Sequence, residues 1–279
     1  MNIGIVGQGY VGKAVRDVFQ KHYHIETFDI DKSLSSTESV KELAKISDLI
    51  FICVPTPMNK DGSCNINSVK KVVGDIETSH SNRCKIVAIK STVPPGTTED
   101  FNKHCKSLRV VFNPEFLTEA NFIEDFRNQN RIIIGGPRPA STQLRQIYSL
   151  AFPNVPIIKT GSTTAEMVKY MTNSFLATKV SFANEMYNIC GRLGIDYDKV
   201  VEYSTYDERL GKSHWAVPGP DGKLGFGGSC FPKDINALIQ LGLELDMTPE
   251  VLMAAWHTNL DVRPEEDWKE LKGRAVVDE

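Results

Sequence analysis

The sequence has no long block of charge of one sign and no long apolar run, and each absence disfavours a class of protein. Its 279 residues carry a formal net charge of -3, and charged residues make up 24% of them. Without a basic or acidic block, a small molecule or a protein is a more plausible partner than a nucleic acid. No apolar stretch approaches the roughly 18 residues of a membrane span. We therefore expect neither nucleic acid nor membrane among the partners.

Cysteine is scarce and is not spaced as in a metal site. The six cysteines are Cys53, Cys64, Cys84, Cys105, Cys190 and Cys230. None forms a CxxC pair or another zinc-like spacing, so we expect no metal. The first residues, MNIGIVGQGYVG, lack the basic leader and cleavage site of a signal peptide. The sequence thus predicts reduced thiols and a cytoplasmic location.

Short apolar runs alternate with helical patterns over residues 1–161. The runs are NIGIVG, IETFDI, DLIFICVP, CKIVAIKST, LRVVFNP, RIIIGGP and VPIIKTG. Several are apolar at consecutive positions, which is typical of parallel strands covered on both faces. Strands separated by helices indicate βαβ units. We therefore predict an α/β domain with a doubly wound, Rossmann-type sheet.

Helical signals replace strand signals after Gly161. Residues 162–193 contain no proline and predict one helix of about thirty residues, roughly 45 Å long. Thr163 and Glu166 suit a capping box at its start, and Gly194 suits its C-terminal stop. Its apolar residues cover much of its circumference, which predicts burial between domains or subunits. We expect a homodimer formed through this helix.

The remaining residues complete an all-helical domain over 162–279. Further helices are predicted at 196–204, 232–245 and 249–260. The final stretch, RPEEDWKELKGRAVVDE, is charged, and we expect it to be peripheral.

The segment GIVGQGYVG places three glycines in GxGxxG spacing between a predicted strand and a predicted helix. Gly7 permits a tight turn, Gly9 lets the backbone approach a pyrophosphate, and Gly12 lets the helix pack on the strand. Asp29 ends the second strand, where a carboxylate binds the ribose hydroxyls of NAD and repels the 2′-phosphate of NADP. A glycine turn without a ligand is the alternative, but the strand, spacing, helix and acid together favour an NAD site.

The segments after the third and fourth strands should complete that site, because ligands lie at the carboxyl ends of such strands. CVPTP (53–57) and KSTVPPGT (90–97) offer hydroxyls and rigid prolines there, although ordinary loop chemistry explains them equally well. The further cofactor contacts that we expect are Tyr10, Val11, Val54, Pro55, Thr56, Ser91 and Thr92.

The segment GFGGSCFPKD places a cysteine at the predicted start of a helix. Cys230 precedes Pro232, a preferred first helical residue, and the helix dipole favours a thiolate there. The preceding glycines permit close approach of a substrate, and Asp234 follows one turn on. The alternative is a buried, inert thiol, which Cys53 and Cys190 fit well.

Two polar residues lie one turn apart on the long predicted helix. Lys169 and Asn173 are at positions i and i+4, so both project from one face. They need polar partners if they are buried, and they could alternatively form a solvated helix edge.

Together these segments resemble the UDP-glucose/GDP-mannose dehydrogenase family. The matching stretches are GQGYVG, CVPTP, KSTVPPGT, NPEFLTEA, AEMVKYMTNSFLATKVSFANE and GFGGSCFPKD, in family order over nearly the whole chain. The resemblance implies that two NAD molecules in succession oxidise the C6 alcohol of a nucleotide sugar to an acid. It also implies that Cys230 carries a thiohemiacetal and then a thioester. UDP-glucose is the favoured sugar, GDP-mannose or a UDP-amino-sugar is the alternative, and a non-catalytic NAD-binding protein is a third reading.

The resemblance also implies roles for individual residues. Lys169 and Asn173 stabilise the oxyanion and hold the substrate, and Glu115 is the base for thioester hydrolysis. Thr92 and Asp234 position the water that takes the alcohol proton. Glu119 lies near cofactor and substrate, Lys233 meets a cofactor phosphate, and Arg209 serves the neighbouring subunit's substrate. The implied substrate contacts are Glu115, Phe116, Leu117, Lys169, Asn173, Arg209, Phe226 and Gly227.

The sequence departs from the family pattern in three places. Family members usually carry a further C-terminal nucleotide-binding domain, which we expect this chain to lack. The segment AVPGPDGK is longer than expected and is predicted to contact substrate or a neighbouring subunit. Leu34 stands where a basic residue often holds the adenosine ribose, a role that Lys32 is expected to take.

Overall fold

The structure is a computed structural model that describes residues 1–79, 81–82 and 86–278. Cys84 therefore lies outside the described residues. The chain divides into two compact units. Unit 1 comprises Met1–Thr56 and Ile66–Lys169, and unit 2 comprises Pro57–Asn65 and Tyr170–Glu279.

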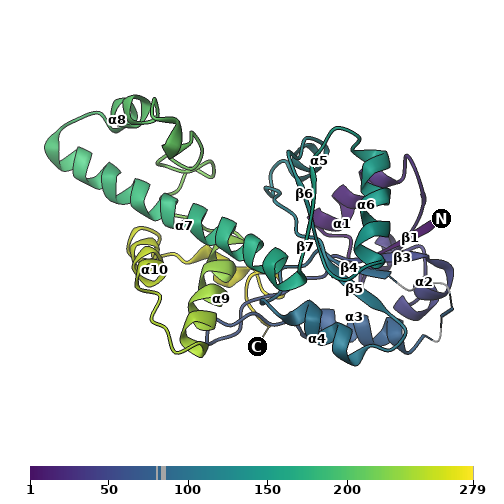
Figure 1. Ribbon diagram of the computed structural model, residues 1–279. Coiled ribbons are helices and arrows are strands. Elements are labelled where there is room, and N and C mark those ends of the chain that lie inside the picture. Colours follow the sequence, from purple (N-terminus) through teal and green to yellow (C-terminus); the bar gives the residue numbers. More distant parts are fainter. Residues whose placement is uncertain (80, 83–85, 279) are drawn as a thin grey trace. The chain divides into compact units, whose positions relative to one another are not determined.

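Unit 1 is built on a sheet whose strands all match the predicted runs (Figure 1). The strands are β1 (Asn2–Val6), β2 (His24–Phe28), β3 (Leu49–Ile52), β4 (Ile86–Ile89), β5 (Arg109–Phe112), β6 (Ile132–Gly135) and β7 (Ile157–Thr160). Among the described residues they follow the order β2-β1-β3-β4-β5-β6-β7. All neighbours are parallel except β5 and β6, which are antiparallel. Antiparallel neighbours need no crossover connection across a sheet face. The apolar pattern of a strand does not reveal its direction, so the sequence did not predict this pairing.

Helices cover both faces of this sheet. They are α1 (Tyr10–Phe19), α2 (Val40–Ile46), α3 (Asn67–Glu77), α4 (Thr97–His104), α5 (Phe122–Arg127) and α6 (Ala140–Ala151), with a short 3-10 helix at Lys32–Leu34. One buried cluster joins the strands to α1, α5 and α6, and the other joins them to α2, α3 and α4. This arrangement confirms the predicted doubly wound fold.

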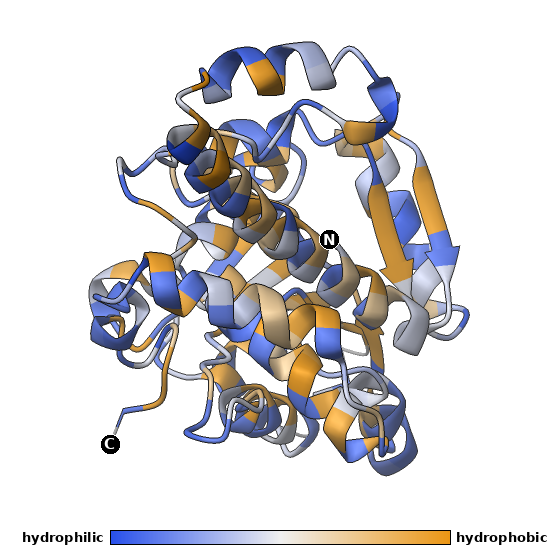
Figure 2. Ribbon diagram, turned by 90° about the vertical axis from the view of Figure 1, so that its left-hand side faces the viewer, coloured by the Kyte–Doolittle hydropathy of each residue, from blue (hydrophilic) through white to orange (hydrophobic). Residues whose placement is uncertain are grey.

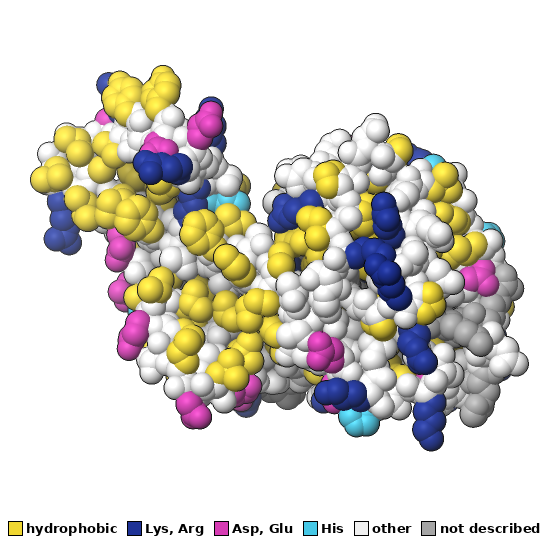
Figure 3. Space-filling model, viewed as in Figure 1, with side chains coloured by type: hydrophobic (Ala, Val, Ile, Leu, Met, Phe, Trp, Pro, Cys, Tyr) yellow, Lys and Arg dark blue, Asp and Glu magenta, His cyan; other side chains and the backbone are white. Residues whose placement is uncertain are grey.

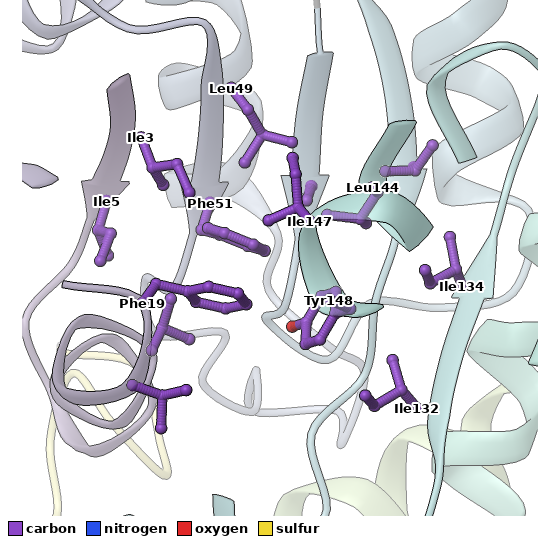
Figure 4. Close-up of a cluster of buried hydrophobic side chains, with 14 of the residues drawn as sticks. Ile3, Ile5, Phe19, Leu49, Phe51, Ile132, Ile134, Leu144, Ile147 and Tyr148 are labelled. Carbon is purple, nitrogen blue, oxygen red and sulfur yellow. The ribbon is translucent and has the colours of Figure 1, made fainter. Parts of the chain in front are cut away.

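The first cluster is rich in aromatic rings (Figure 4). Phe19 of α1 stacks on Phe51 of β3 at 5.6 Å between ring centroids, and its ring meets Tyr148 of α6 edge-on at 5.1 Å. Phe51 faces this cluster, whereas its neighbours Ile50 and Ile52 face the opposite one. Because successive strand residues point to opposite faces, consecutive apolar residues bury both sides of the sheet.

Unit 2 is helical and contains most of the long helix. Helix α7 (Ser162–Leu193) starts in unit 1 and continues through unit 2, with the predicted bounds. The other helices are α8 (Tyr197–Ser204), α9 (Phe231–Glu244) and α10 (Glu250–Val262), with 3-10 turns at Glu208–Leu210 and Asp267–Glu270. Figure 2 shows hydrophobic and hydrophilic residues mixed along these helices, whereas the strands of unit 1 are largely hydrophobic. None of the described helices combines the length and apolar character that crossing a bilayer needs.

The predicted capping box at the start of α7 is wrong, although Gly194 does end the helix with a φ of 69°. Thr163 donates its hydroxyl to Glu99, 2.8 Å away. The buried carboxylate of Glu166 accepts from the backbone N–H groups of Gly96 and Thr98, at 2.7 and 2.8 Å. Glu166 therefore caps helix α4, whose first N–H groups lack partners within their own helix. A contact between segments so distant in sequence overrides the local capping pattern.

The prediction that the charged C-terminal stretch is peripheral is also wrong. Trp268 is fully buried, and its ring lies 5.1 Å from that of Trp256 in α10. Arg263 is 1% exposed and pairs with Asp221 at 2.6 Å and with Asp267 at 2.8 Å. The stretch packs into unit 2 because these carboxylates compensate the buried guanidinium, and one aromatic residue anchors it.

Candidate active site

The glycine-rich turn of unit 1 has the geometry that a dinucleotide diphosphate needs. Gly7 has a φ of 91°, and a Cβ on Gly12 would lie 1.9 Å from the carbonyl oxygen of Gly7. Both positions therefore require glycine. Gly9, by contrast, faces open space and caps α1 with no side-chain hydrogen bond, and the first turn of α1, at Tyr10 and Val11, carries no acidic residue. The positive end of the helix dipole is thus available to an anion, which fits the group that the sequence predicts.

The acidic residue expected at the ribose lies where it was predicted. Asp29 directly follows β2, and its carboxylate accepts from the backbone N–H groups of Gln8 at 2.6 Å and Asp31 at 2.9 Å. The first bond ties the acid to the glycine-rich turn. Lys32 forms an exposed ion pair with Glu38 at 3.0 Å. A small cavity beside them is lined by Asp29 and Lys32 among others.

The segments after β3 and β4 are linked to each other. The hydroxyl of Ser91 donates to the carbonyl of Val54 at 2.6 Å. Thr56 and Thr92 are both buried, at 4% and 6% exposure. Val54, Pro55 and Thr56 follow β3, and Ser91 and Thr92 follow β4, so both segments lie at the carboxyl ends of their strands. Their contacts with the cofactor stay predictions.

The segment after β5 carries a buried ion pair. The ammonium of Lys169 lies 2.9 Å from the carboxylate of Glu115 and also donates to the carbonyl oxygen of Glu115 at 2.8 Å. Glu115 accepts in addition from the N–H of Leu117 at 2.7 Å. Burial raises the pKa of Glu115, but Lys169 and the backbone hydrogen bond outweigh it, so the pKa falls below its ordinary value. Lys169 is therefore no solvated helix edge.

A cavity of about 350 Å³ adjoins this pair in unit 1. Glu115, Phe116, Leu117 and Arg131 are among its lining residues. The guanidinium of Arg131 lies 4.2 Å from the centroid of the Phe116 ring, a cation–π contact. The sequence pattern did not single out Arg131, because only the folded connection between β5 and β6 brings it to Phe116. Glu119 lies in a turn two residues beyond Leu117 and is partly buried.

In unit 2 the candidate nucleophile lies at a helix start. Cys230 caps α9, Pro232 occupies its first turn, and the N–H of Asp234 donates to the carbonyl of Cys230 at 3.0 Å. Cys230 is partly exposed, whereas Cys190 is buried and burial raises the pKa of Cys53 to about 12. Cys53 thus stays protonated near neutral pH, which agrees with the inert role predicted for it.

Three polar side chains beside Cys230 form a buried network. Asp234 is 1% exposed, and it accepts from the amide of Asn173 at 2.6 Å and from the ammonium of Lys233. Burial lowers the pKa of Lys233, but Asp234, Cys230 and Cys64 outweigh it and raise the pKa above its ordinary value. Lys233 is therefore a firmly held cation near the thiol. Its contact with a cofactor phosphate stays a prediction.

The structure explains why glycine occupies positions 225 and 227, before Cys230. A Cβ on Gly225 would lie 2.4 Å from the amide oxygen of Asn259, and one on Gly227 would lie 2.5 Å from the guanidinium of Arg263. Asn259 also binds both backbone groups of Phe226, at 2.7 and 3.0 Å. These glycines thus let α10 and the residue after it approach the loop that carries Cys230.

Two further predictions concern Arg209 and the segment AVPGPDGK (216–223), which precedes the glycine-rich loop of Cys230. Arg209 is 89% exposed and pairs with Asp207. In the segment AVPGPDGK, Asp221 binds Arg263 and Lys223 pairs with Glu265 at 3.3 Å. Part of this segment is therefore fastened within unit 2 itself.

Comparison with known proteins gives two family matches and several relatives. Residues 24–151 match the UDP-glucose/GDP-mannose dehydrogenase family, NAD binding domain, and residues 163–261 match the central domain of the same family. The UDP-glucose 6-dehydrogenase TuaD of Bacillus subtilis (strain 168) is 37% identical over 84% of this chain and 51% of its own length. The UDP-glucose 6-dehydrogenase AglM of Haloferax volcanii is 31% identical over 100% of this chain and 74% of its own length.

A solved structure agrees with these matches. The UDP-glucose dehydrogenase from the hyperthermophilic archaeon Pyrobaculum islandicum superposes with a TM-score of 0.86 at 31% identity, covering 97% of this chain and 70% of that one. The chain thus spans between about half and three quarters of the length of these relatives.

Proposed function

Because this chain belongs to the UDP-glucose/GDP-mannose dehydrogenase family, we propose that it oxidises the C6 alcohol of a nucleotide sugar to a carboxylate, with UDP-glucose as the sugar. The observation that carries the proposal is a buried network at the start of α9: Lys233 and Asp234 lie within one helical turn of Cys230, and Asp234 also accepts from Asn173 of α7. Burying two charges is costly, and a catalytic site is a physical reason to keep them next to a partly exposed thiol.

NAD is the cofactor of unit 1, which contains the family's NAD-binding domain. When bound, NAD accepts the electrons of each oxidation. The open first turn of α1 would hold its diphosphate, and Asp29 would hold its ribose. The hydroxyls of Ser91 and Thr92, and Val54, Pro55, Thr56 and Glu119, are the further contacts that we assign to it.

The thiol of Cys230 carries the covalent chemistry in this proposal. Asp234, with Thr92, holds the water that takes the proton of the C6 hydroxyl. The Cys230 sulfur then bonds to the carbonyl carbon of the aldehyde, giving a thiohemiacetal, and the second oxidation leaves a thioester. The cation of Lys233 supports the thiolate that begins this attack.

The ion pair of unit 1 serves the last step of the proposal. Glu115 deprotonates the water that hydrolyses the thioester, which frees Cys230 and releases the acid. Lys169 and Asn173 donate to the oxyanion of each tetrahedral stage. Phe116, Leu117, Phe226 and Gly227 contact the substrate, and Arg209 reaches the substrate of a second subunit.

One assay tests the reaction. The purified chain is incubated with NAD and UDP-glucose, GDP-mannose or a UDP-amino-sugar, and NADH is followed by absorbance. Two NADH per acid formed, with UDP-glucose preferred, is the expected result. Cys230→Ser should form no acid, and mass spectrometry should detect no acyl adduct on it. NAD binding without turnover of any sugar would instead favour a non-catalytic NAD-binding protein.

We propose in addition that the chain pairs with a second copy through α7. Large apolar side chains lie exposed along this helix at Met171, Phe175, Phe182, Ile189 and Leu193, with exposures between 48% and 67%. With 3.6 residues per turn, all five fall within a sector of about 40°, and so form one stripe. Figure 3 shows hydrophobic side chains gathered over α7 and α8.

Such a stripe is costly in water and is typical of an interface. Light scattering at micromolar concentration should give twice the mass of one chain, and Phe175→Glu should give a monomer. A wild-type monomer would contradict the pairing.

A further inference from the structure

Lys90 is a buried cation that neither the sequence patterns nor the proposed reaction assign to any task. It follows β4 and is 2% exposed. Its ammonium donates to the carbonyl oxygen of Asn113 at 3.1 Å, to the side-chain oxygen of Asn113 at 3.0 Å and to the hydroxyl of Tyr148 at 3.3 Å. It also lies 5.4 Å from the centroid of the Phe126 ring. Burying an ammonium is costly, so this arrangement calls for a reason beyond packing.

Asn113 is the first residue after β5, and its hydrogen bonds hold the segment that follows in one position. Its backbone N–H donates to the carbonyl of Ile89 in β4 at 2.8 Å, and its side-chain amide donates to the carbonyl of Ile133 in β6 at 2.7 Å. Its side-chain oxygen accepts from both Lys90 and the hydroxyl of Tyr148. Asn113 is thus held from both neighbouring strands and from α6, and Glu115 follows it by only two residues.

The charge of Lys90 acts on Glu115 as well. The groups that face Lys90 are Cys53 after β3, Glu115 after β5, Tyr148 of α6 and Lys169 of α7. Burial lowers the pKa of Lys90 to about 8, and Lys90 contributes after Lys169 to the lowering of the pKa of Glu115. Two cations therefore act on Glu115. Lys169 binds its carboxylate directly, and Lys90 binds Asn113, two residues before it.

We propose that Lys90 is a positioning residue that, through Asn113 and Tyr148, holds Glu115 in the orientation in which it pairs with Lys169. Lys90 does not touch the reacting atoms. Without its ammonium, the carbonyl oxygen and the side-chain oxygen of Asn113 each lose a donor, and the segment from Asn113 to Leu117 becomes more mobile. The consequence for catalysis rests on the proposed role of Glu115 in thioester hydrolysis. The consequence for the turn does not.

The activity experiment compares Lys90→Met with Lys103→Met, which removes an exposed lysine of α4. We expect Lys90→Met to lower kcat by about tenfold or more with the KM for the sugar nearly unchanged, because misplacing a catalytic group slows chemistry more than binding. A rapid release of two NADH per site should precede slow turnover, since only hydrolysis is impaired. Lys103→Met should match the wild type. Unchanged kcat in Lys90→Met would overturn the role in turnover.

An experiment that needs no activity tests the positioning itself. The N–H of Leu117 donates to the Glu115 carboxylate, so its hydrogen exchange reports on the turn. In Lys90→Met we expect its exchange to accelerate about tenfold while amides of β1, such as that of Ile5, keep their protection. Equal acceleration at both amides, or none at Leu117, would overturn the proposal.

A second variant covers a failure of Lys90→Met to fold. Tyr148→Phe keeps the lysine and removes only the hydroxyl that bonds Lys90 and Asn113. We expect the same local acceleration at Leu117, smaller in size, and its absence would overturn the proposal. If the wild type oxidises no nucleotide sugar, the proposed function fails, and the exchange at Leu117 still decides the role of Lys90.

Discussion

Asp234→Asn should lower the free energy of unfolding far more than its small change in side-chain volume suggests. The carboxylate of Asp234 is 1% exposed and accepts from two donors, Asn173 and Lys233. Asparagine offers one oxygen and one NH₂ group, so one of these donors would face another donor. The ammonium of Lys233, whose side chain is 12% exposed, would also lose its anion.

The size of the effect follows from breaking a buried ion pair. Removing one partner of such a pair costs about 3–5 kcal/mol, because a charge stays buried without compensation. For a domain of this size, about 2–4 °C of Tm corresponds to each kcal/mol, so we expect a decrease of roughly 6–20 °C. The pKa of Lys233 is raised in the fold, so the stabilisation is complete at neutral pH and is lost only as the pH rises through the folded value.

Matched variants make this prediction decisive. Asp207→Asn breaks the exposed pair with Arg209 and should destabilise the fold far less than Asp234→Asn, because water screens an exposed ion pair. Lys233→Met combined with Asp234→Asn should be more stable than Asp234→Asn alone, since the uncompensated cation is gone. Urea unfolding at pH 7 measures all three. An equal loss in the Asp207 and Asp234 variants, or no recovery in the double variant, would refute the reasoning.

Further predictions concern the cofactor turn, a helix cap and the C-terminal stretch. Gly9→Ala should fold normally and weaken NAD binding in calorimetry, because its Cβ enters the open space proposed for the diphosphate, whereas Gly12→Ala should destabilise unit 1, because its Cβ would collide with the carbonyl of Gly7. Equal thermal stability of these two variants would contradict this distinction. Glu166→Ala should cost about 1–3 kcal/mol in urea unfolding, since one buried and one partly buried N–H group lose their acceptor, and Glu166→Gln should cost less. Trp268→Ala should cost about 3–5 kcal/mol, and a loss below 1 kcal/mol would contradict the view that Trp268 anchors the stretch.

The fold of unit 1 could be predicted from the sequence because its signals are local. Each strand is a short apolar run, and each run is separated from the next by a helical pattern. The glycine spacing at Gly7–Gly12 needs only a strand before it and a helix after it, and both are present. The reversed direction of β6 and β7 escaped prediction, since an apolar run does not reveal the direction of its strand.

The candidate residues divide in the same way. The position of Cys230 at the start of α9 follows from Pro232, two residues later, which is a local signal. The partners of Lys169 and Asn173 lie 54 and 61 residues away along the chain, and no periodicity identifies them. The family resemblance named Glu115 and Asp234. Only the fold shows that Lys169 bonds to Glu115 and that Asn173 bonds to Asp234.

Glu166 illustrates why a correct local motif can still give a wrong contact. Its spacing from Thr163 suits a capping box, yet its carboxylate is buried and accepts from the first N–H groups of α4. The buried N–H of Thr98 and the partly buried N–H of Gly96 have no acceptor within α4, so the Glu166 carboxylate stabilises the start of that helix. The choice between these two sets of donors depends on α4 packing against α7, a contact between segments about 70 residues apart that a local sequence motif does not reveal.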